Sequence, residues 1–113
     1  MFTLPIKAGW CDLILHGYKK EEYRKITLYN TIRLKKLFDC EGMSQKEFIN
    51  SVNADDSGRY RAEAILKSGG NNGGRMAKVK FTLKVKEGEV CWGAESGTLY
   101  YALVIEEASE VKQ

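Results

Sequence analysis

The sequence predicts an α+β fold: a small β-barrel of about five to six mostly antiparallel strands, with two to three short helices packed around it. Three observations support this fold class. Residues 77–86 alternate strictly between apolar and polar side chains, residues 98–105 form a nearly continuous apolar run, and helical patterns lie near the start of the chain. Short strands with helices inserted between the first of them are typical of a barrel decorated by helices.

The first two elements are a strand and a helix. Residues 2–6 are expected to form a short strand, and Pro5 suits its edge or end because proline has no backbone N–H. Residues 8–16 follow as a helix, and Gly17 can adopt the left-handed conformation that ends it. The buried stripe of this helix is predicted from apolar residues spaced by three and four positions: Trp10, Leu13 and Ile14.

Residues 20–26 form the next candidate strand, and two helices follow it. Thr27 or Asn30 can cap the first helix. The second begins at a capping box, in which the side chains of Ser44 and Glu47 each bond the other's backbone N–H. The apolar positions of the first helix are Ile32, Leu34, Leu37 and Phe38, where it is expected to end. Those of the second are Phe48, Ile49 and Val52.

The second half of the chain is predicted to form strands. Residues 59–67 contain alanines that permit a helix, but their alternating pattern favours a strand. Residues 69–74 form a glycine-rich loop that lacks the Lys-Ser/Thr of a P-loop. Residues 77–86 are a half-buried strand, and residues 98–105 suit a central strand covered on both faces. The outer face of the 77–86 strand carries Lys78, Lys80, Lys84 and Lys86, which either protect a sheet edge or form a strip of phosphate contacts.

Length and composition indicate one globular domain, residues 1–113. Of the 113 residues, 43% are hydrophobic and 29% are charged. No uncharged apolar run approaches the ~20 residues that span a bilayer, and the first residues lack the pattern of a signal peptide. We therefore expect a cytoplasmic protein with no membrane partner and with a monomer as the default state.

Metal and cofactor chemistry has little support in the sequence. The cysteines Cys11, Cys40 and Cys91 show no Cys-x-x-Cys spacing, and His16 is the sole histidine. A zinc site needs about four ligands at characteristic spacings. We predict no metal, no cofactor and reduced cysteines that serve as small packing residues.

The charge of the chain is unevenly placed, although its net value is only +3. Residues 18–36 contain seven Lys/Arg and two Glu, residues 59–86 contain eight Lys/Arg and one Glu, and the stretch from Glu106 is acidic. A basic middle of this kind can attract polyanions such as RNA. A solvated surface without a partner explains the charge alone equally well.

The segment with most chemical content is Gly17-Tyr18-Lys19-Lys20-Glu21-Glu22-Tyr23-Arg24, which has the pattern Gly-x-Lys-x-x-Glu-x-Arg. On a strand, Glu22 and Arg24 share one face and can form a buried ion pair, which adds little net stability and so indicates a site. An arginine fork grips a phosphate or a base edge, and a glutamate accepts from an amino group of a base. Burial of Lys19 in a pocket without water would lower its pKa, and the neutral amine could then act as a base or nucleophile. The alternative is an exposed, salt-bridged strand rim.

Aromatic residues near this segment can stack on a base, each contributing roughly 1–3 kcal/mol. They are Trp10, Tyr18, Tyr23 and Trp92. The predicted nucleic-acid-binding residues are Trp10, Lys19, Lys20, Glu22, Tyr23, Arg24 and Trp92.

The Gly17–Arg24 segment resembles the signature of the ASCH domain family, a relative of the PUA domain. The later segment Trp92-Gly93-Ala94-Glu95-Ser96-Gly97, followed by Tyr100 and Tyr101, is similar to small stand-alone members of bacteria and their phages. The resemblance spans residues 3–37 and 60–107. It implies a PUA-like β-barrel with a cleft lined by the motif residues.

The resemblance implies binding of RNA or of a modified nucleoside or nucleotide as the main function. Some stand-alone members are amidohydrolases that deacylate N4-acylated cytidine with the motif lysine, a threonine three residues later and a glutamate. Lys19 matches the lysine, Glu22 occupies the threonine position, and Glu95 is the acidic residue to test, so Lys19, Glu22 and Glu95 are the catalytic candidates if the protein is an enzyme. An RNA-cleaving activity has little support, because the sequence offers neither a histidine pair nor a metal cluster for it. A protein-interaction domain without a nucleic-acid ligand is the remaining alternative.

Overall fold

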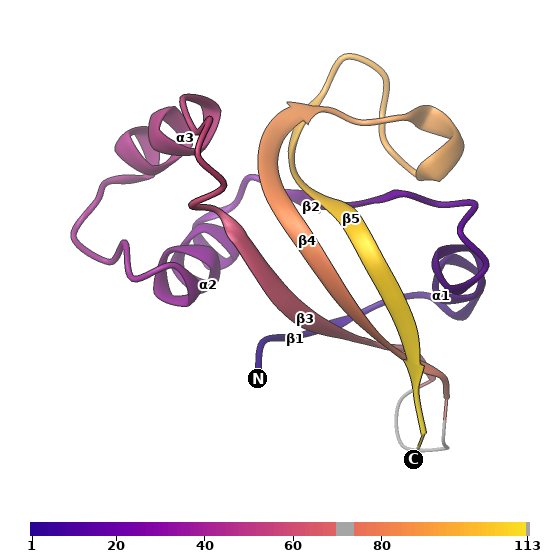
Figure 1. Cartoon of the computed structure of the whole chain (residues 1–113). Coiled ribbons are helices and arrows are strands. Elements are labelled where there is room, and N and C mark those ends of the chain that lie inside the picture. The colour runs from indigo at the N-terminus through magenta and orange to yellow at the C-terminus, as the bar shows by residue number, and fades with distance from the viewer. Residues whose placement is uncertain (70–73, 113) are drawn as a thin grey trace.

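The computed structural model describes residues 1–69 and 74–112, which form a five-stranded mixed sheet curled into a half-barrel and three α-helices (Figure 1). The α+β class is thereby confirmed, and the sheet is open on one side rather than a closed barrel. The strands are β1 (Thr3–Pro5), β2 (Glu21–Lys25), β3 (Arg61–Lys67), β4 (Met76–Glu87) and β5 (Leu99–Val111). The helices are α1 (Ala8–Leu15), α2 (Leu28–Leu37) and α3 (Gln45–Asn53), with a 3₁₀ turn, η2 (Val90–Trp92).

The sheet order is β1-β3-β4-β5-β2, so the first two strands of the chain lie at opposite edges. β1 pairs with β3 in parallel, and the other three pairs are antiparallel. In Figure 1, α1 lies on one side of the long strands, and α2 and α3 lie together on the other. The segment between β1 and β2, which contains α1, therefore crosses from one edge of the sheet to the other.

Two arginines bridge the open side of the half-barrel. Arg24 of β2 donates from Nη2 to the backbone oxygen of Pro5, at 2.5 Å. Arg33 of α2 donates from Nη2 to the backbone oxygen of Thr3, at 2.7 Å. The free edge of β1 thus receives hydrogen bonds from side chains where a sixth strand would otherwise supply them, which protects the edge from pairing with another chain.

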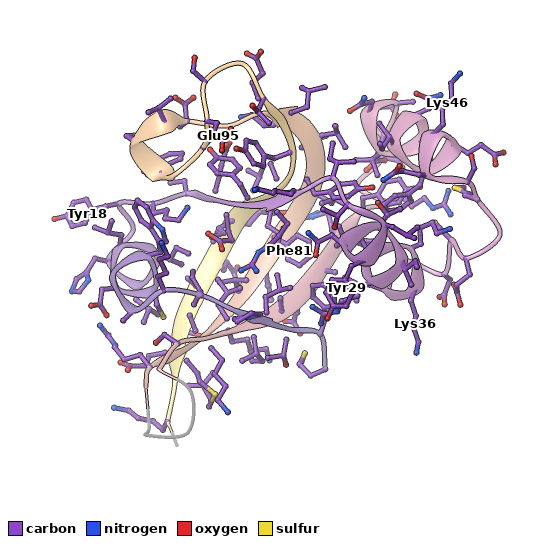
Figure 2. The ribbon with its side chains drawn as sticks, turned by 180° about the vertical axis from the view of Figure 1, so that it is seen from behind. Tyr18, Tyr29, Lys36, Lys46, Phe81 and Glu95 are labelled. Carbon is purple, nitrogen blue, oxygen red and sulfur yellow. The ribbon has the colours of Figure 1, made fainter. Side chains whose placement is uncertain are left out.

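The core consists of the inward side chains of the strands and one face of each helix. Phe81 of β4 lies in the middle of the molecule (Figure 2) and is fully buried. Phe38 meets the rings of Phe81 and Tyr60 edge-to-face, at centroid distances of 6.5 and 5.2 Å, an arrangement that aromatic pairs favour. Of the apolar residues that alternate through residues 59–67 and 77–86, seven are buried as predicted, namely Tyr60, Ala64, Leu66, Ala77, Val79, Phe81 and Leu83, whereas Ala62 and Val85 are half-buried.

The helix starts predicted from capping residues are confirmed. Thr27 caps α2 by accepting from the backbone N–H of Asn30, and Ser44 and Glu47 form the capping box of α3. Phe48 and Val52 of α3 are fully buried as predicted.

Two predicted helix faces are wrong in part. In α1 the buried residues are Cys11 and Ile14, whereas Leu13 is exposed. In α2 the apolar Ile32 is 52% exposed and the polar Thr31 is buried. Thr31 tolerates burial because its hydroxyl shares a 2.6 Å hydrogen bond with Tyr101, which satisfies both polar groups.

Most lysines on the outer face of β4 form ion pairs. Lys78 pairs with Glu63 at 3.8 Å, and Lys80 pairs with Glu107 at 3.5 Å. Lys86 pairs with Glu21 at 2.7 Å. Carboxylates on β3, β5 and β2 therefore pair with three of the four lysines of this face, which favours a solvated surface over the alternative of a phosphate-binding strip.

No helix within residues 1–69 and 74–112 is long and apolar enough to cross a membrane. The glycine-rich loop predicted at residues 69–74 lies largely outside the described residues.

Candidate functional site

A turn at the end of α1 delivers the first motif to the sheet edge. Gly17 has a φ of 81°, a conformation in which glycine carries no Cβ penalty. The N–H of Gly17 bonds the oxygen of Ile14, and the N–H of Tyr18 bonds the oxygen of Leu13, which together form a Schellman motif. The turn ends α1, and Lys19 follows it two residues before the start of β2.

Lys19 is buried, with a relative exposure of 2%. Its Nζ lies 3.2 Å from Oε1 of Glu22 and donates to the backbone oxygens of Glu21, at 2.5 Å, and Trp92, at 3.1 Å. The ammonium also lies 5.0 Å from the ring centroid of Trp10 and 5.2 Å from that of Tyr23. Burial lowers the pKa of Lys19, and the charge and hydrogen bond of Glu22 oppose this effect.

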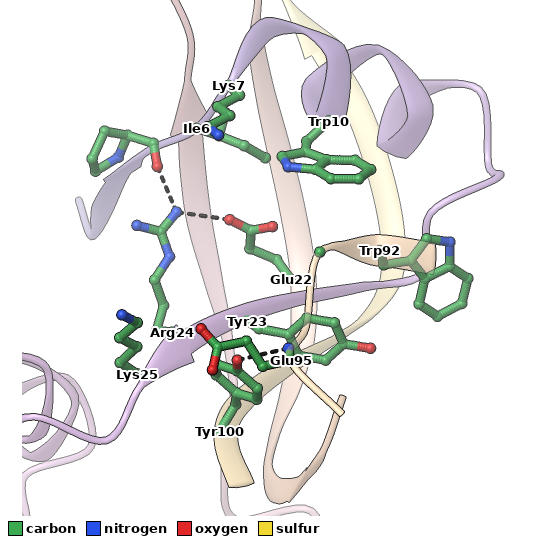
Figure 3. Close-up of a pocket in the computed structure, with 12 residues that line it drawn as sticks. Ile6, Lys7, Trp10, Glu22, Tyr23, Arg24, Lys25, Trp92, Glu95 and Tyr100 are labelled. Atoms are coloured by element: carbon green, nitrogen blue, oxygen red, sulfur yellow. Dashed lines mark hydrogen bonds and ion pairs between the residues drawn. The ribbon is translucent and has the colours of Figure 1, made fainter. Parts of the chain in front are cut away.

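Glu22 joins Lys19 to Arg24. Its Oε2 accepts from Arg24 Nη2 at 2.8 Å, so the ion pair predicted from the strand pattern is present and lies partly buried (Figure 3). The same Arg24 nitrogen also reaches Pro5 of β1. Glu22 is thus held from two sides by cations, at the point where the two edge strands approach each other.

The second motif lies on the first because residues 88–98, here called the cover segment, are pinned at three places. Tyr23 Oη accepts from the N–H of Glu89 at 2.8 Å, and Tyr100 Oη accepts from the N–H of Glu95 at 2.9 Å. The third pin is the bond from Lys19 to the oxygen of Trp92. The Tyr23 hydroxyl donates in turn to Oε1 of Glu21 at 2.7 Å. Burial raises the pKa of Tyr23, the N–H of Glu89 opposes this effect, and the bond to Glu21 adds to it.

The two motifs and β1 enclose a pocket of about 310 Å³ (Figure 3), near the lower end of ligand sites, which span about 300–1,000 Å³. Six residues singled out from the sequence line it: Trp10, Glu22, Tyr23, Arg24, Trp92 and Glu95. The sequence interpretation missed the other six: Pro5, Ile6, Lys7, Lys25, Gly93 and Tyr100.

Three residues singled out from the first motif, Tyr18, Lys19 and Lys20, do not line this pocket. Lys19 contacts Glu22 but lines a separate surface hollow, together with Lys20. Tyr18 is 71% exposed and points away from the molecule (Figure 2). Lys20 directly precedes β2, so the alternation of strand side chains does not extend to it.

A few of the missed residues carried a signal. Lys25 directly follows the motif, and Tyr100 stands in the tyrosine pair after the second motif. Pro5, Ile6 and Lys7 carried none, because only the folding of β1 toward β2 brings them to the site.

The pocket combines an apolar wall, an acceptor and a cationic rim. The indole of Trp10 lies beside the Glu22 carboxylate in Figure 3, and Lys7 and Lys25 lie on opposite sides of the opening. The described residues contain no group of three or more His, Cys, Asp or Glu side chains that could hold a metal ion. The arrangement therefore suits recognition of a flat, polar ligand that carries negative charge.

Comparisons with family models, with curated proteins and with solved structures found no match to this chain. The likeness to the ASCH family therefore depends on the residues of the two motifs alone.

Proposed function

We propose that this protein binds RNA or a modified nucleotide as a PUA-like ASCH domain, with one base in the pocket between β1, β2 and the cover segment. The observation that carries this proposal is the placement of Glu22. Its carboxylate lines the pocket, is 9% exposed, and is fixed by Lys19 on one oxygen and Arg24 on the other.

The bonding of Glu22 supports recognition of a group that donates N–H. Each carboxylate oxygen has two lone-pair positions and can only accept. One cation occupies each oxygen, so an acceptor position remains on each. An exocyclic amino group of a base, such as that of cytosine, is a donor of the required kind.

The aromatic side chains support a planar ligand. Trp10, Trp92 and Tyr100 line the pocket beside Glu22. Stacking of a base on such a ring contributes roughly 1–3 kcal/mol and tolerates any base, because every base has a π-face. Stacking would supply affinity and Glu22 would supply selectivity.

The cations at the opening support a phosphate. Lys7 and Lys25 are exposed and line the pocket, and neither forms an ion pair with any described residue. A phosphate bound between them would release counterions, so affinity should fall with salt.

Tryptophan fluorescence tests the proposal directly, because the chain has two tryptophans and both line the pocket. Short single-stranded RNA is titrated into the wild type and into Lys7→Gln/Lys25→Gln at two salt concentrations. We expect RNA to quench the fluorescence, with an affinity that falls as salt rises. In the double variant the slope of log K against log salt concentration should be shallower, by about 0.7 for each phosphate contact that is lost.

Lys46→Gln is the matched control, because Lys46 is exposed on α3 and lies outside the pocket. Binding that ignores salt, or a double variant that behaves like the control, would count against the proposal.

A second candidate function is hydrolysis of N4-acylated cytidine, which the 3.2 Å contact between Lys19 and Glu22 favours. With Glu22 at the threonine position, a carboxylate would act as general base. It would take a proton from water as the water oxygen adds to the acyl carbon. The C–N bond would then break, and the cytidine amino group would leave with the returned proton.

Incubation with N4-acetylcytidine tests this second function. It predicts cytidine and acetate in equal amounts from the wild type and none from Glu22→Gln, with Glu95→Gln assayed in parallel. No product over hours at high protein concentration would rule out this activity and leave the binding proposal standing.

A further inference from the structure

We propose that the exposed face of α2 is a second contact surface for single-stranded RNA and carries the nucleotides that flank the base in the pocket. This inference rests on the proposed function. The α2 surface is defined as Leu28, Tyr29, Ile32, Arg33 and Lys36, which lie on one side of the helix because neighbours among them are three or four positions apart.

The apolar residues of this face have no place in the core. Leu28 is 73% exposed, Tyr29 is 69% exposed and Ile32 is 52% exposed, while the opposite face of the helix buries Thr31 and Leu34. Figure 2 shows Tyr29 and Lys36 at the outside of the molecule. Large apolar side chains gathered on one face mark a surface that another molecule covers.

The charges around the α2 surface indicate what that molecule is. α2 carries Arg33, Lys35 and Lys36 and no acidic residue. Among the described residues, Arg33 and Lys36 form no ion pair. On the outer face of the sheet, in contrast, Arg61, Arg75, Lys78, Lys80 and Lys86 each pair with a carboxylate. On α2, three cations lie on one helix that has no carboxylate of its own, so a polyanion would be attracted to this side.

Contacts connect the α2 surface to the pocket. Arg24 lines the pocket and also a small adjoining cavity, which Asn30 and Arg33 line from α2. Asn30 donates from Nδ2 to the backbone oxygen of Lys25 at 2.9 Å, so the pocket rim and the helix start are held together. Arg33 then lies 5.8 Å from the ring centroid of Tyr29.

An exposed tyrosine beside an arginine fits a stacked base. Single-stranded nucleic acids bind grooves in which cations follow the phosphates and aromatic rings stack on the bases. On the α2 surface the ring is Tyr29 and the cations are Arg33 and Lys36, and Lys25 lies between this surface and the pocket. An exposed ring beside two cations, next to a pocket that we propose holds a base, favours single-stranded RNA as the molecule that covers this surface.

Binding as a function of RNA length tests the inference. Affinities are measured for a nucleoside monophosphate and for oligonucleotides of two to six residues, with wild type, Tyr29→Ala and Lys36→Gln. We expect longer RNA to bind at least about tenfold more tightly than the monophosphate. Tyr29→Ala should weaken the binding of oligonucleotides at least about fivefold and leave monophosphate binding unchanged. Lys46→Gln on α3 is the matched control for Lys36→Gln and should change neither.

The outcomes separate this inference from the function on which it rests. If the monophosphate binds and longer RNA gains nothing, or if Tyr29→Ala binds oligonucleotides like the wild type, the α2 surface is not an RNA contact and a protein partner becomes its assignment. If neither ligand binds, the proposed function fails and this inference fails with it. Thermal melts of the variants exclude unfolding as a cause, since both substituted side chains are exposed.

Discussion

The side chain of Lys19 is buried, and the groups around its ammonium offset the cost of that burial. Three oxygens, from Glu22, Glu21 and Trp92, surround its ammonium group, and two aromatic rings flank it. An ammonium has three N–H donors, so all of them have partners. Lys19 therefore joins three parts of the molecule, namely the first motif, the strand that follows it and the cover segment.

Replacement of Lys19 should destabilise the protein without removing the pocket. Lys19→Ala leaves Glu22 paired with Arg24 but removes the donor from two backbone oxygens, at a cost of about 3 kcal/mol in the free energy of unfolding. Urea denaturation measures this cost. Lys84→Ala, a lysine on the outer face of β4, should change stability by no more than about 0.5 kcal/mol, and a Lys19→Ala cost as small as that would contradict the role of a joint.

Asp55 should govern part of the stability in acid. Desolvation opposes ionisation of its carboxyl, but hydrogen bonds from the backbone N–H groups of Tyr60, Ser57 and Arg59 outweigh it and lower the pKa of Asp55 to about 2, from an ordinary 3.8. A lowered carboxyl pKa gives stability that is complete above the unfolded value and is lost as the pH falls toward the folded value.

Asp55→Asn removes this contribution. We expect the variant to be less stable than the wild type above pH 4, and the gap between them to close between pH 4 and pH 2. Denaturant midpoints at pH 6, 4, 3 and 2 measure the gap, and a gap that does not change with pH would contradict the role assigned to Asp55.

At the scale of elements, glycine at position 93 determines how the cover segment lies against Trp10. Gly93 ends η2 with a φ of 98°, and a Cβ built there would lie 3.2 Å from Cζ2 of Trp10. Any other residue at this position would adopt a strained backbone conformation and would push the Trp10 ring away by a few tenths of an ångström. The two tryptophan-containing parts of the pocket approach each other because of this glycine.

Gly93→Ala should cost about 1–2 kcal/mol, the strain of an L-residue in the left-handed region, and should change the tryptophan emission by displacing Trp10. Gly9→Ala is the matched control. Gly9 lies in α1 with nothing within 4 Å of its would-be Cβ, so alanine there should stabilise the helix by about 0.5–1 kcal/mol. Equal effects of the two substitutions would contradict the packing described.

Most elements could be predicted from the sequence because their signals are local. The capping box at Ser44, the left-handed glycine at position 17 and the alternation in β4 each act within a few residues. The parallel pairing of β1 with β3 joins segments about sixty residues apart, and no local pattern encodes it.

The site was predictable to the same extent. Glu22 and Arg24 could be paired from strand alternation alone. The direction of Lys19 could not, because a turn and not a strand precedes β2. The part that β1 plays in the pocket depends on the curl of the whole sheet, and the exposure of Ile32 depends on the burial of Thr31 by a hydrogen bond that only the folded molecule makes.

For the whole molecule, the open half-barrel is the organising feature. β1 has three residues and one strand neighbour, so its second edge relies on Arg24 and Arg33. Both arginines lie next to surfaces that we propose bind RNA. Closure of the half-barrel and recognition of a ligand therefore share residues.

Loss of one bridge should loosen β1. In Arg33→Ala, hydrogen exchange should speed up at the amides of Ile65 and Ile6, which bond the backbone oxygens of Phe2 and Lys67 across the β1–β3 pair. Arg61→Ala removes an exposed ion pair with Glu106 on the outer face and should leave these two amides unchanged. Unaltered exchange in Arg33→Ala would show that the bond from Arg33 to Thr3 does not hold β1 in place.

The most direct test of the central claim is the affinity of Glu22→Gln for short single-stranded RNA, read from the quenching of Trp10 and Trp92. Removal of a negative charge would strengthen binding to a polyanion if charge alone mattered. If Glu22 accepts a hydrogen bond from a base, the variant should bind about tenfold or more weakly, while Glu41→Gln at an exposed site should bind like the wild type or slightly tighter. Glu22→Gln that remains folded and binds as tightly as the wild type would contradict the proposed site.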